Sequence, residues 1–508
     1  MNRGKKSLYS AMTAITLTFL NGFLGLIVTR LIISSYGSDF NGINSTANQL
    51  INMLLIVEGG FTLATNFALF KPLAERNFGV VNSIMAATKN IFIRIASIFL
   101  GLGILTSIGY AMMIKSGLPI EIAILTFTMT VVSTAFNLFY ATKYSILLQT
   151  EQREYILNSI KICTVVISQL SIIAIVFLNG HMVLVRFATM MGSIINSLAI
   201  GYMCKRCYKQ LDFKVTPDYS KIKGTKDVMV QKLTSMLYST FPIMFVAVTV
   251  GTMYASVYAV YNSVFTLIKG VLYSLINAAR MGFGQLIAQK DKDYVFGVFI
   301  QYEYIVINAM LCLLTTAAVL IMPFMNLYTA GIADVGYKDW GIAILLILIT
   351  FFEIIHIPSG NIINVSGNFK TGRNFQSIAC VVLVVSMLVG NIIFGFLGIL
   401  SAVLLTAILL AFLEINFIYH VYFENSILTF LRILVPNTIL SLSLIYGEIT
   451  MLPLVHNYIQ FMLSGFFLMV VNAALILVFN LIVNKTVTIK VLHRVRSLTK
   501  KFKTKNHI

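Results

Sequence analysis

Four basic residues lie within long apolar stretches of this 508-residue chain, where an uncompensated charge is expensive. They are Arg30, Arg94, Lys269 and Arg280. A charge inside a membrane span is costly and usually faces a cavity or a partner. Arginine suits phosphate because its planar fork makes paired hydrogen bonds. The chemistry that these residues predict is the binding of an anionic group within a membrane.

Lys269 and Arg280 lie on one polar face of a predicted helix. They are eleven residues apart, which is close to three helical turns. A polar stripe inside a transmembrane helix indicates water or polar partners rather than lipid. We favour a cavity lining, and a hydrogen-bonded seam between helices is the alternative. The stripe consists of Asn262, Thr266, Lys269, Tyr273, Asn277 and Arg280.

Two acidic sites accompany these cations. Glu58 borders a second stripe and precedes Gly59 and Gly60, where a helix can loosen. Glu353 and His356 are one turn apart, just before Pro358. They suit proton handling, and a structural ion pair or a hydrogen-bonded kink is an equally good interpretation. Close helix packing is the alternative for the second stripe, which consists of Asn44, Asn48, Asn52, Gly59, Thr62 and Asn66.

The remaining basic residues of the apolar stretches lie nearer the predicted membrane surfaces. Long side chains there can snorkel, with the stem in lipid and the charge in water. Arg30 is about one turn from the outer end of its span. Its side chain can therefore either snorkel to the outer surface or point inward and bind an anionic substrate. We expect snorkelling for Lys89, Lys143, Lys161, Lys232 and Arg432 on the inner side and for Arg186 on the outer side.

The elements that must position these residues are transmembrane helices. The chain is 58% hydrophobic and only 11% charged, with a mean hydropathy of +0.88, whereas soluble domains are about a quarter charged. Apolar stretches of 18 or more residues recur along the chain, and the short alternating segments of a barrel do not. The sequence predicts an all-α polytopic membrane protein with about fourteen spans.

The placement of lysine and arginine sets the orientation. With the N-terminus inside, inward segments hold 25 of the 37 Lys and Arg residues, and outward turns hold two, Lys115 and Lys338. This split obeys the positive-inside rule and places both termini in the cytoplasm. The net charge of +19 therefore reflects topology and does not indicate nucleic acid.

The longest polar segment, 204–227, divides the chain. We predict an N-terminal lobe at 1–203 (spans 1–6), a cytoplasmic linker at 204–227 and a C-terminal lobe at 228–420 (spans 7–12). Two appended spans at 428–484 and a basic cytoplasmic tail at 485–508 follow. A weak internal echo at an offset near 215 residues relates YGSDFNGINSTANQL to VGTMYASVYAVYNSVF.

The sequence contains no constellation that indicates an enzyme or a bound cofactor. Five cysteines are spread out, and CKRC at 204–207 has no second ligand pair near it, so we expect plain thiols and no metal site. We expect no cofactor other than a coupling ion, H⁺ or Na⁺.

The segment TRLIISSYGSDFNGINSTANQLINMLLIVEGGFTLATNFALFKPLAERN, residues 29–77, resembles the N-terminal region of bacterial polysaccharide flippases. These are the Wzx-type exporters (O-antigen, capsule or teichoic-acid-like) of the multidrug/oligosaccharidyl-lipid/polysaccharide (MOP) superfamily. The similarity is best over residues 10–100. It extends more loosely through YASVYAVYNSVFTLIKG and the fourteen-span plan.

This resemblance implies a MATE/MOP-like fold with two pseudo-symmetric six-helix lobes in a V, plus two C-terminal helices. It implies alternating access in a bacterial cytoplasmic membrane, moving undecaprenyl-diphosphate-linked oligosaccharide repeat units to the outer leaflet. Membrane lipids and a polysaccharide polymerase are the implied partners. Arg30, Arg94, Lys269 and Arg280 match the family's cationic central cavity in residue type and span. Drug exporters of the superfamily tend to carry an acid in the first span, and its absence here favours an anionic substrate.

Several other functions fit parts of the pattern. A lipid II flippase and a cation-coupled multidrug antiporter share the expected fold. A membrane polysaccharide polymerase or acyltransferase belongs to a different class, and it usually needs a sizeable outer loop or a catalytic constellation. A scaffold or a scramblase would lack ion coupling.

Overall fold

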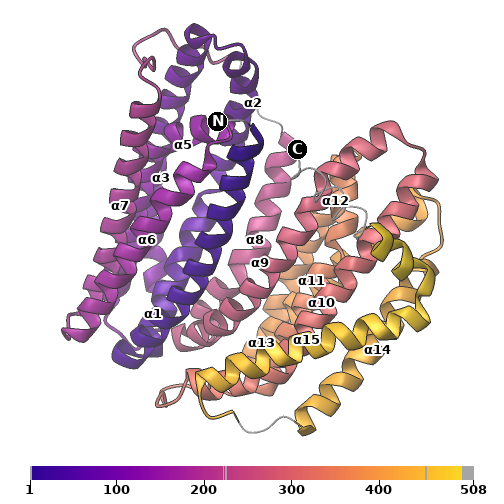
Figure 1. Cartoon of the computed structure of the whole chain (residues 1–508). Helices are drawn as coiled ribbons and strands as arrows, with labels where there is room; N and C mark the ends of the chain where they lie inside the picture. Colours follow the sequence, from indigo (N-terminus) through magenta and orange to yellow (C-terminus); the bar gives the residue numbers. More distant parts are fainter. Residues whose placement is uncertain (1–2, 221, 223–225, 452–454, 495–508) are drawn as a thin grey trace. The chain divides into compact units, whose positions relative to one another are not determined.

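The computed structural model describes all residues except 1–2, 221, 223–225, 452–454 and 495–508. The described part is helical and contains no strand (Figure 1). Its helices are α1 (Arg3–Leu54), α2 (Ile56–Ala74), α3 (Phe78–Met113), α4 (Ile120–Phe136), η1 (Asn137–Ala141), α5 (Thr142–Thr150), α6 (Glu154–Phe177), α7 (Met182–Cys207), α8 (Lys226–Thr249), α9 (Thr252–Gln289), α10 (Lys292–Tyr328), α11 (Trp340–Ile355), α12 (Ile357–Val365), α13 (Phe369–Asn416), η2 (Phe417–Tyr422), α14 (Leu428–Met451) and α15 (Tyr458–Val483).

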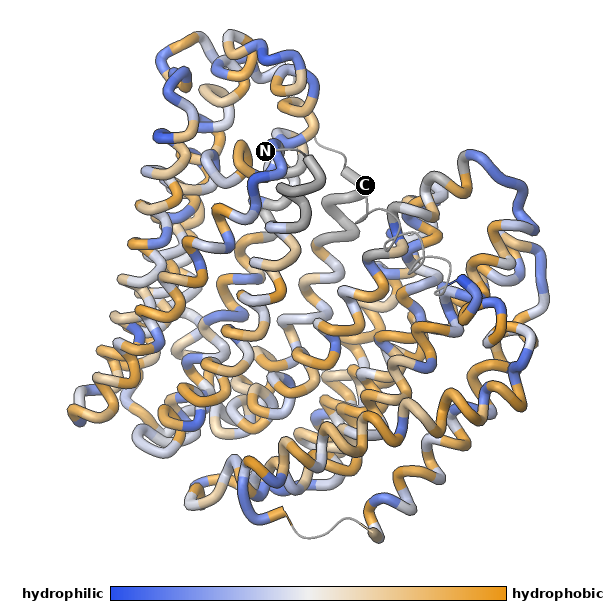
Figure 2. Tube along the Cα trace, in the orientation of Figure 1, coloured by the Kyte–Doolittle hydropathy of each residue, from blue (hydrophilic) through white to orange (hydrophobic). Residues whose placement is uncertain are grey.

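The predicted number of membrane spans is confirmed for this part of the chain. Eleven helices are long and apolar enough to cross a membrane, and a shorter apolar helix covers Leu233–Thr249. Two of the eleven are each divided by a glycine with a left-handed backbone, Gly37 in α1 (φ +85°) and Gly395 in α13 (φ +55°). Together these segments account for the fourteen spans. Figure 2 shows hydrophobic residues along the helices and hydrophilic residues gathered at their ends.

Helix interruptions fall near, though not always at, the predicted positions. The loosening expected at Gly59 lies four residues earlier, because α1 ends at Leu54 and α2 begins at Ile56. The expected interruption near Pro358 is present, since α11 ends at Ile355 and α12 begins at Ile357. Pro358 has no N–H to donate to the carbonyl of Ile354, which weakens the helix at this point.

The chain forms two compact units. Unit 1 comprises residues 1–263 and 331–336, and unit 2 comprises 264–330 and 337–508. Residues 228–263, which were predicted to belong to the C-terminal lobe, pack in unit 1, where α8 lies against α1 and α2. The division into six-helix repeats stays a prediction.

Within unit 1, the turn after the first span is fixed by carboxylates. Asp39 accepts hydrogen bonds from the amide of Gly117 (2.6 Å), the hydroxyl of Ser116 (2.9 Å) and the hydroxyl of Thr252. Asp334 accepts from both the amide and the hydroxyl of Ser38, at 2.7 and 2.8 Å. These bonds join the turns around Asp39, Ser116 and Asp334 to one another and to the start of α9 at Thr252.

The two segments of the internal echo contact each other in unit 1. The Nδ2 of Asn41 donates to the Oγ of Ser256 at 2.7 Å. Gly42 lies so near the backbone of Thr252 that a Cβ would be 1.8 Å from its carbonyl oxygen. Gly37 and Gly251, at matching places in the echo, both have positive φ. The sequence echo therefore corresponds to two glycine turns, each leading into a long helix.

Within unit 2, the two appended helices, α14 and α15, pack on α10. Asn480 of α15 donates through Nδ2 to Asn308 of α10 (2.9 Å) and to Asn437 of α14 (2.6 Å). Asn437 and Asn480 are fully buried. Buried amides bonded to one another fix the register of the three helices.

We predict that a reporter placed after Ile508, or within 204–227, reads as cytoplasmic. These two segments carry fifteen of the basic residues, and lysine and arginine retain a loop on the inner side. Residues 495–508 lie outside the described residues. A fusion series with paired inner-side and outer-side reporters measures this, and an outer-side signal at either place contradicts the topology.

Candidate functional site

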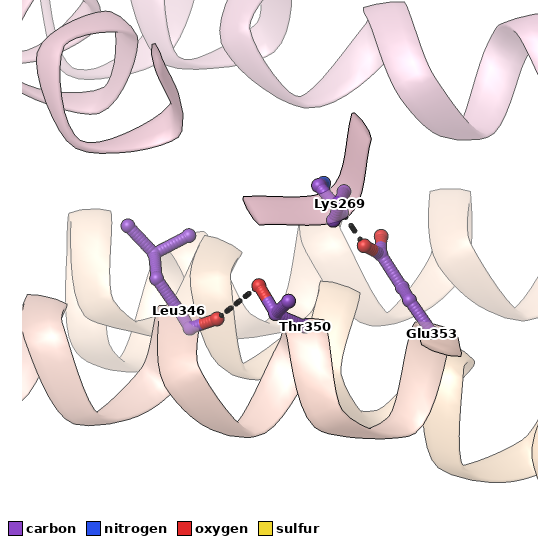
Figure 3. A network of polar contacts seen from close by, with 4 residues as sticks. All are labelled: Lys269, Leu346, Thr350 and Glu353. Atoms are coloured by element: carbon purple, nitrogen blue, oxygen red, sulfur yellow. Dashed lines mark hydrogen bonds and ion pairs between the residues drawn. The ribbon is translucent and has the colours of Figure 1, made fainter. Parts of the chain in front are cut away.

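Lys269 of α9 and Glu353 of α11 form an ion pair inside unit 2. The Nζ of Lys269 lies 3.0 Å from the Oε2 of Glu353, and the two side chains are 17% and 14% exposed. Figure 3 shows the lysine reaching down to the carboxylate; one turn before it, the Thr350 hydroxyl donates to the carbonyl of Leu346 (2.8 Å). The sequence identified both charges separately, and the structure brings them together.

A second pair of ionisable side chains, His356 and Glu414, lies next to the Lys269–Glu353 pair along the chain. His356 is one turn after Glu353, and its Nδ1 lies 2.9 Å from the Oε2 of Glu414 on α13. Glu414 is 3% exposed, and it was not among the site residues predicted from the sequence. A Cβ on Gly360 would lie 2.5 Å from the same oxygen, so the glycine makes room for the carboxylate. We call Lys269, Glu353, His356 and Glu414 the unit-2 charge cluster.

The rest of the α9 stripe is more open. Tyr273 is 38% exposed, and Arg280, eleven residues beyond Lys269, is also exposed. Asn262 lies at the end of the part of α9 that packs in unit 1. Lys269 thus forms an ion pair, whereas Tyr273 and Arg280 are exposed, and the cavity lining stays a prediction.

The other predicted site residues lie in unit 1. Arg30 is half-buried, seven residues before Gly37. Glu58 accepts a hydrogen bond from Thr62 (2.6 Å), one turn further along α2. Arg94 is exposed on α3. Gly25, five residues before Arg30, has open space beside it, because no atom lies within 4 Å of the point that a Cβ would occupy.

The prediction that Arg186 and Lys143 snorkel is wrong. Arg186 is 4% exposed and donates to Thr130 (2.8 Å), Asn44 (2.8 Å) and Asn48 (2.9 Å). Lys143 is 7% exposed, and its Nζ donates to the carbonyl of Phe139 at 3.1 Å. Both lie near a span end in the sequence, but neighbouring acceptors hold them inside. The Asn44 stripe gave the signal, since its amides are the acceptors.

Two cavities that share lining residues lie in unit 1, and Arg186 lines the first of them. One has a volume of about 290 Å³ and is lined by Arg186 and Asn48, and the other measures about 370 Å³ and is lined by Lys161. No Asp or Glu of the described chain lines either cavity. The cavities share the side chains of Ser133, Thr134, Thr189 and Ser193.

An apolar groove of about 610 Å³ lies between α14 and α15 in unit 2. Leu444, Leu463, Phe467 and Leu475 are among its lining residues. One acid, Glu448, lies within it. Most of the residues that line the groove are apolar.

Comparison with known proteins identifies the architecture. No protein-family model and no curated protein sequence matches the chain. An inward-facing multidrug resistance MATE transporter of the MOP superfamily superposes with a TM-score of 0.62 at 11% identity, covering 85% of this chain and 98% of that one. The lipid II flippase MurJ, in an inward closed conformation, superposes with a TM-score of 0.61 at 14% identity. The match covers 92% of this chain and 98% of that one. A MOP superfamily transporter from Pyrococcus furiosus, described as having a binding pocket of reverse polarity, superposes with a TM-score of 0.53 at 12% identity. The match covers 86% of this chain and 94% of that one. This chain has the fold of the MATE and MurJ transporters of the MOP superfamily.

Proposed function

We propose that the protein is a flippase that moves undecaprenyl-diphosphate-linked oligosaccharide repeat units across a bacterial cytoplasmic membrane by alternating access. The observation that carries this proposal is the exposure of Arg94 and Arg280 on helices of membrane-spanning length. A guanidinium facing hydrocarbon is expensive, so these side chains need water or an anionic ligand. A diphosphate is such a ligand, and arginine binds it through paired hydrogen bonds.

The apolar groove between α14 and α15 supports a lipid-linked substrate. A polyprenyl chain is hydrocarbon, and a groove lined mostly by apolar side chains buries it at little polar cost. The chain thus offers cations for a diphosphate and an apolar surface for its lipid anchor. A substrate that lacked either part would leave one of these features unused.

Analysis of lipid-linked intermediates tests the proposal. A strain that lacks the protein should accumulate undecaprenyl-diphosphate-linked repeat units, seen by mass spectrometry of extracted lipids. Plasmid expression of the intact chain should clear them. A deletion strain with a normal lipid profile and normal surface glycan contradicts the proposal.

A lipid II flippase is the second candidate, since the structural similarity to MurJ covers 92% of this chain. The same extraction separates the two functions. Accumulated lipid II in the deletion strain supports this second function, whereas accumulated longer repeat units support the first.

Arg30 provides a graded test of diphosphate binding. We expect export to fall in the order Arg30, Arg30→Lys, Arg30→Ala, because lysine keeps the charge and loses the paired geometry, and alanine loses both. The lysine step should cost about tenfold, equivalent to one strong hydrogen bond. Export of labelled glycan measures the order. Equal export by the arginine and lysine forms would identify Arg30 as a snorkelling residue only.

A further inference from the structure

The guanidinium of Arg186 is buried in unit 1 without an acidic partner among the described residues. It is 4% exposed, and its hydrogen bonds go to the oxygens of Thr130, Asn44 and Asn48, all of them neutral. Neutral acceptors satisfy N–H groups but do not cancel the charge. A buried cation that persists in a folded protein is normally paired.

The asparagines around Arg186 are oriented by it. A guanidinium has five donors and no acceptor, so Asn44 and Asn48 must turn their Oδ1 atoms toward it. Their Nδ2 groups, each with two donors, then face away. Asn48 is exposed and lines the same 290 Å³ cavity as Arg186. A positive charge and an outward-turned amide donor therefore lie in the wall of one cavity.

The adjoining cavity has the same sign of charge. Lys161 lines it, and no carboxylate of the described chain lines either space. The shared hydroxyls of Ser133, Thr134 and Thr189 donate to backbone carbonyls of their own helices. Their oxygens remain to accept hydrogen bonds from water. The two spaces can therefore hold a small anion together with its residual hydration.

We propose that unit 1 binds a small inorganic anion, such as chloride, against Arg186 in the 290 Å³ cavity. The anion supplies the missing counter-charge, with Arg186 and the Nδ2 of Asn48 as donors. The site is separate from the residues of the proposed transport function, because Arg186 and Asn48 are not among the residues proposed to bind the diphosphate. A phosphate oxygen of a bound lipid would satisfy the same chemistry, and the addition of pyrophosphate separates the two sources.

Thermal unfolding of the purified full-length protein tests the site. In sodium chloride, compared with sodium gluconate at equal sodium concentration, the unfolding midpoint should rise and saturate as chloride fills the site. Arg186→Gln should abolish this chloride-dependent rise. Lys71→Gln is the matched control: its side chain is 84% exposed, and the full rise should remain. A wild-type midpoint that ignores chloride, or an undiminished rise in Arg186→Gln, overturns the proposal.

A measurement on the wild-type protein covers the case in which Arg186→Gln does not fold. Crystals grown in sodium bromide should show anomalous scattering within hydrogen-bond distance of an Arg186 Nη atom. Bromide found only elsewhere refutes the site. Adding inorganic pyrophosphate then identifies the source of the anion. Displaced bromide supports an anion site that also accepts phosphate, and retained bromide supports a site for halide alone.

Discussion

Lys269→Gln should reduce transport by at least tenfold and also lower the stability of unit 2. The lysine lies 3.0 Å from Glu353, and the two side chains are only 17% and 14% exposed. Removal of one partner from a buried ion pair leaves an uncompensated charge, at a cost of about 3–5 kcal/mol in fully buried cases. Unfolding midpoints and export of labelled glycan, measured on the same variants, give the two effects.

The double variant Lys269→Gln/Glu353→Gln separates stability from function. Two neutral amides leave no buried charge, so much of the lost stability should return. Transport should stay low if the lysine takes part in binding an anionic substrate. A double variant that is both stable and fully active would show that the pair only holds α9 against α11.

A matched control lies in the same unit. Lys292 and Glu424 also form an ion pair, at 3.3 Å, but their side chains are 60% and 74% exposed. An exposed pair is screened by water and contributes little to stability. Lys292→Gln should therefore leave both the unfolding midpoint and transport near the wild-type values. A loss comparable with that of Lys269→Gln would mean that any lysine removed from unit 2 has this effect.

The number and type of the elements could be predicted because they depend on one-dimensional properties. The length of the apolar stretches gives the spans. Lys269, Glu353 and His356 could be identified because they lie deep in their predicted spans, where a charge is conspicuous. Their partners could not, because the sequence does not say which helices are neighbours.

Arg186 and Glu414 show where sequence reasoning stops. Arg186 is four residues beyond the start of α7, and this position near the end of a span led to the prediction that its side chain reaches the membrane surface. The structure turns it inward because α1 offers two amide oxygens. Glu414 lies near the end of an apolar span, and its pairing with His356 is a contact that the sequence does not show. Both residues required tertiary contacts to be recognised.

Gly42→Ala should prevent the formation of stable unit 1. A Cβ at this position would lie 1.8 Å from the carbonyl oxygen and 2.6 Å from the carbonyl carbon of Thr252. Overpacking of a core usually costs about 1–3 kcal/mol, and this value assumes that side chains can yield. Here the obstacle is backbone, so one helix must move away from the other. That movement would also stretch the bond from Asn41 to Ser256.

Gly101→Ala is the matched control for this prediction, because nothing lies within 4 Å of a Cβ at Gly101 in α3. Alanine in a helix is favoured over glycine by about 0.5–1 kcal/mol, so this variant should be neutral or slightly stabilised. Size-exclusion profiles and unfolding midpoints of the detergent-solubilised proteins measure both variants. Thr252→Ala in the Gly42→Ala background should not rescue it, since the clash is with the carbonyl rather than the side chain. If Gly42→Ala matched Gly101→Ala, the close approach of α1 to α9 would not be needed, and the contact between the two echo segments would lose its structural role.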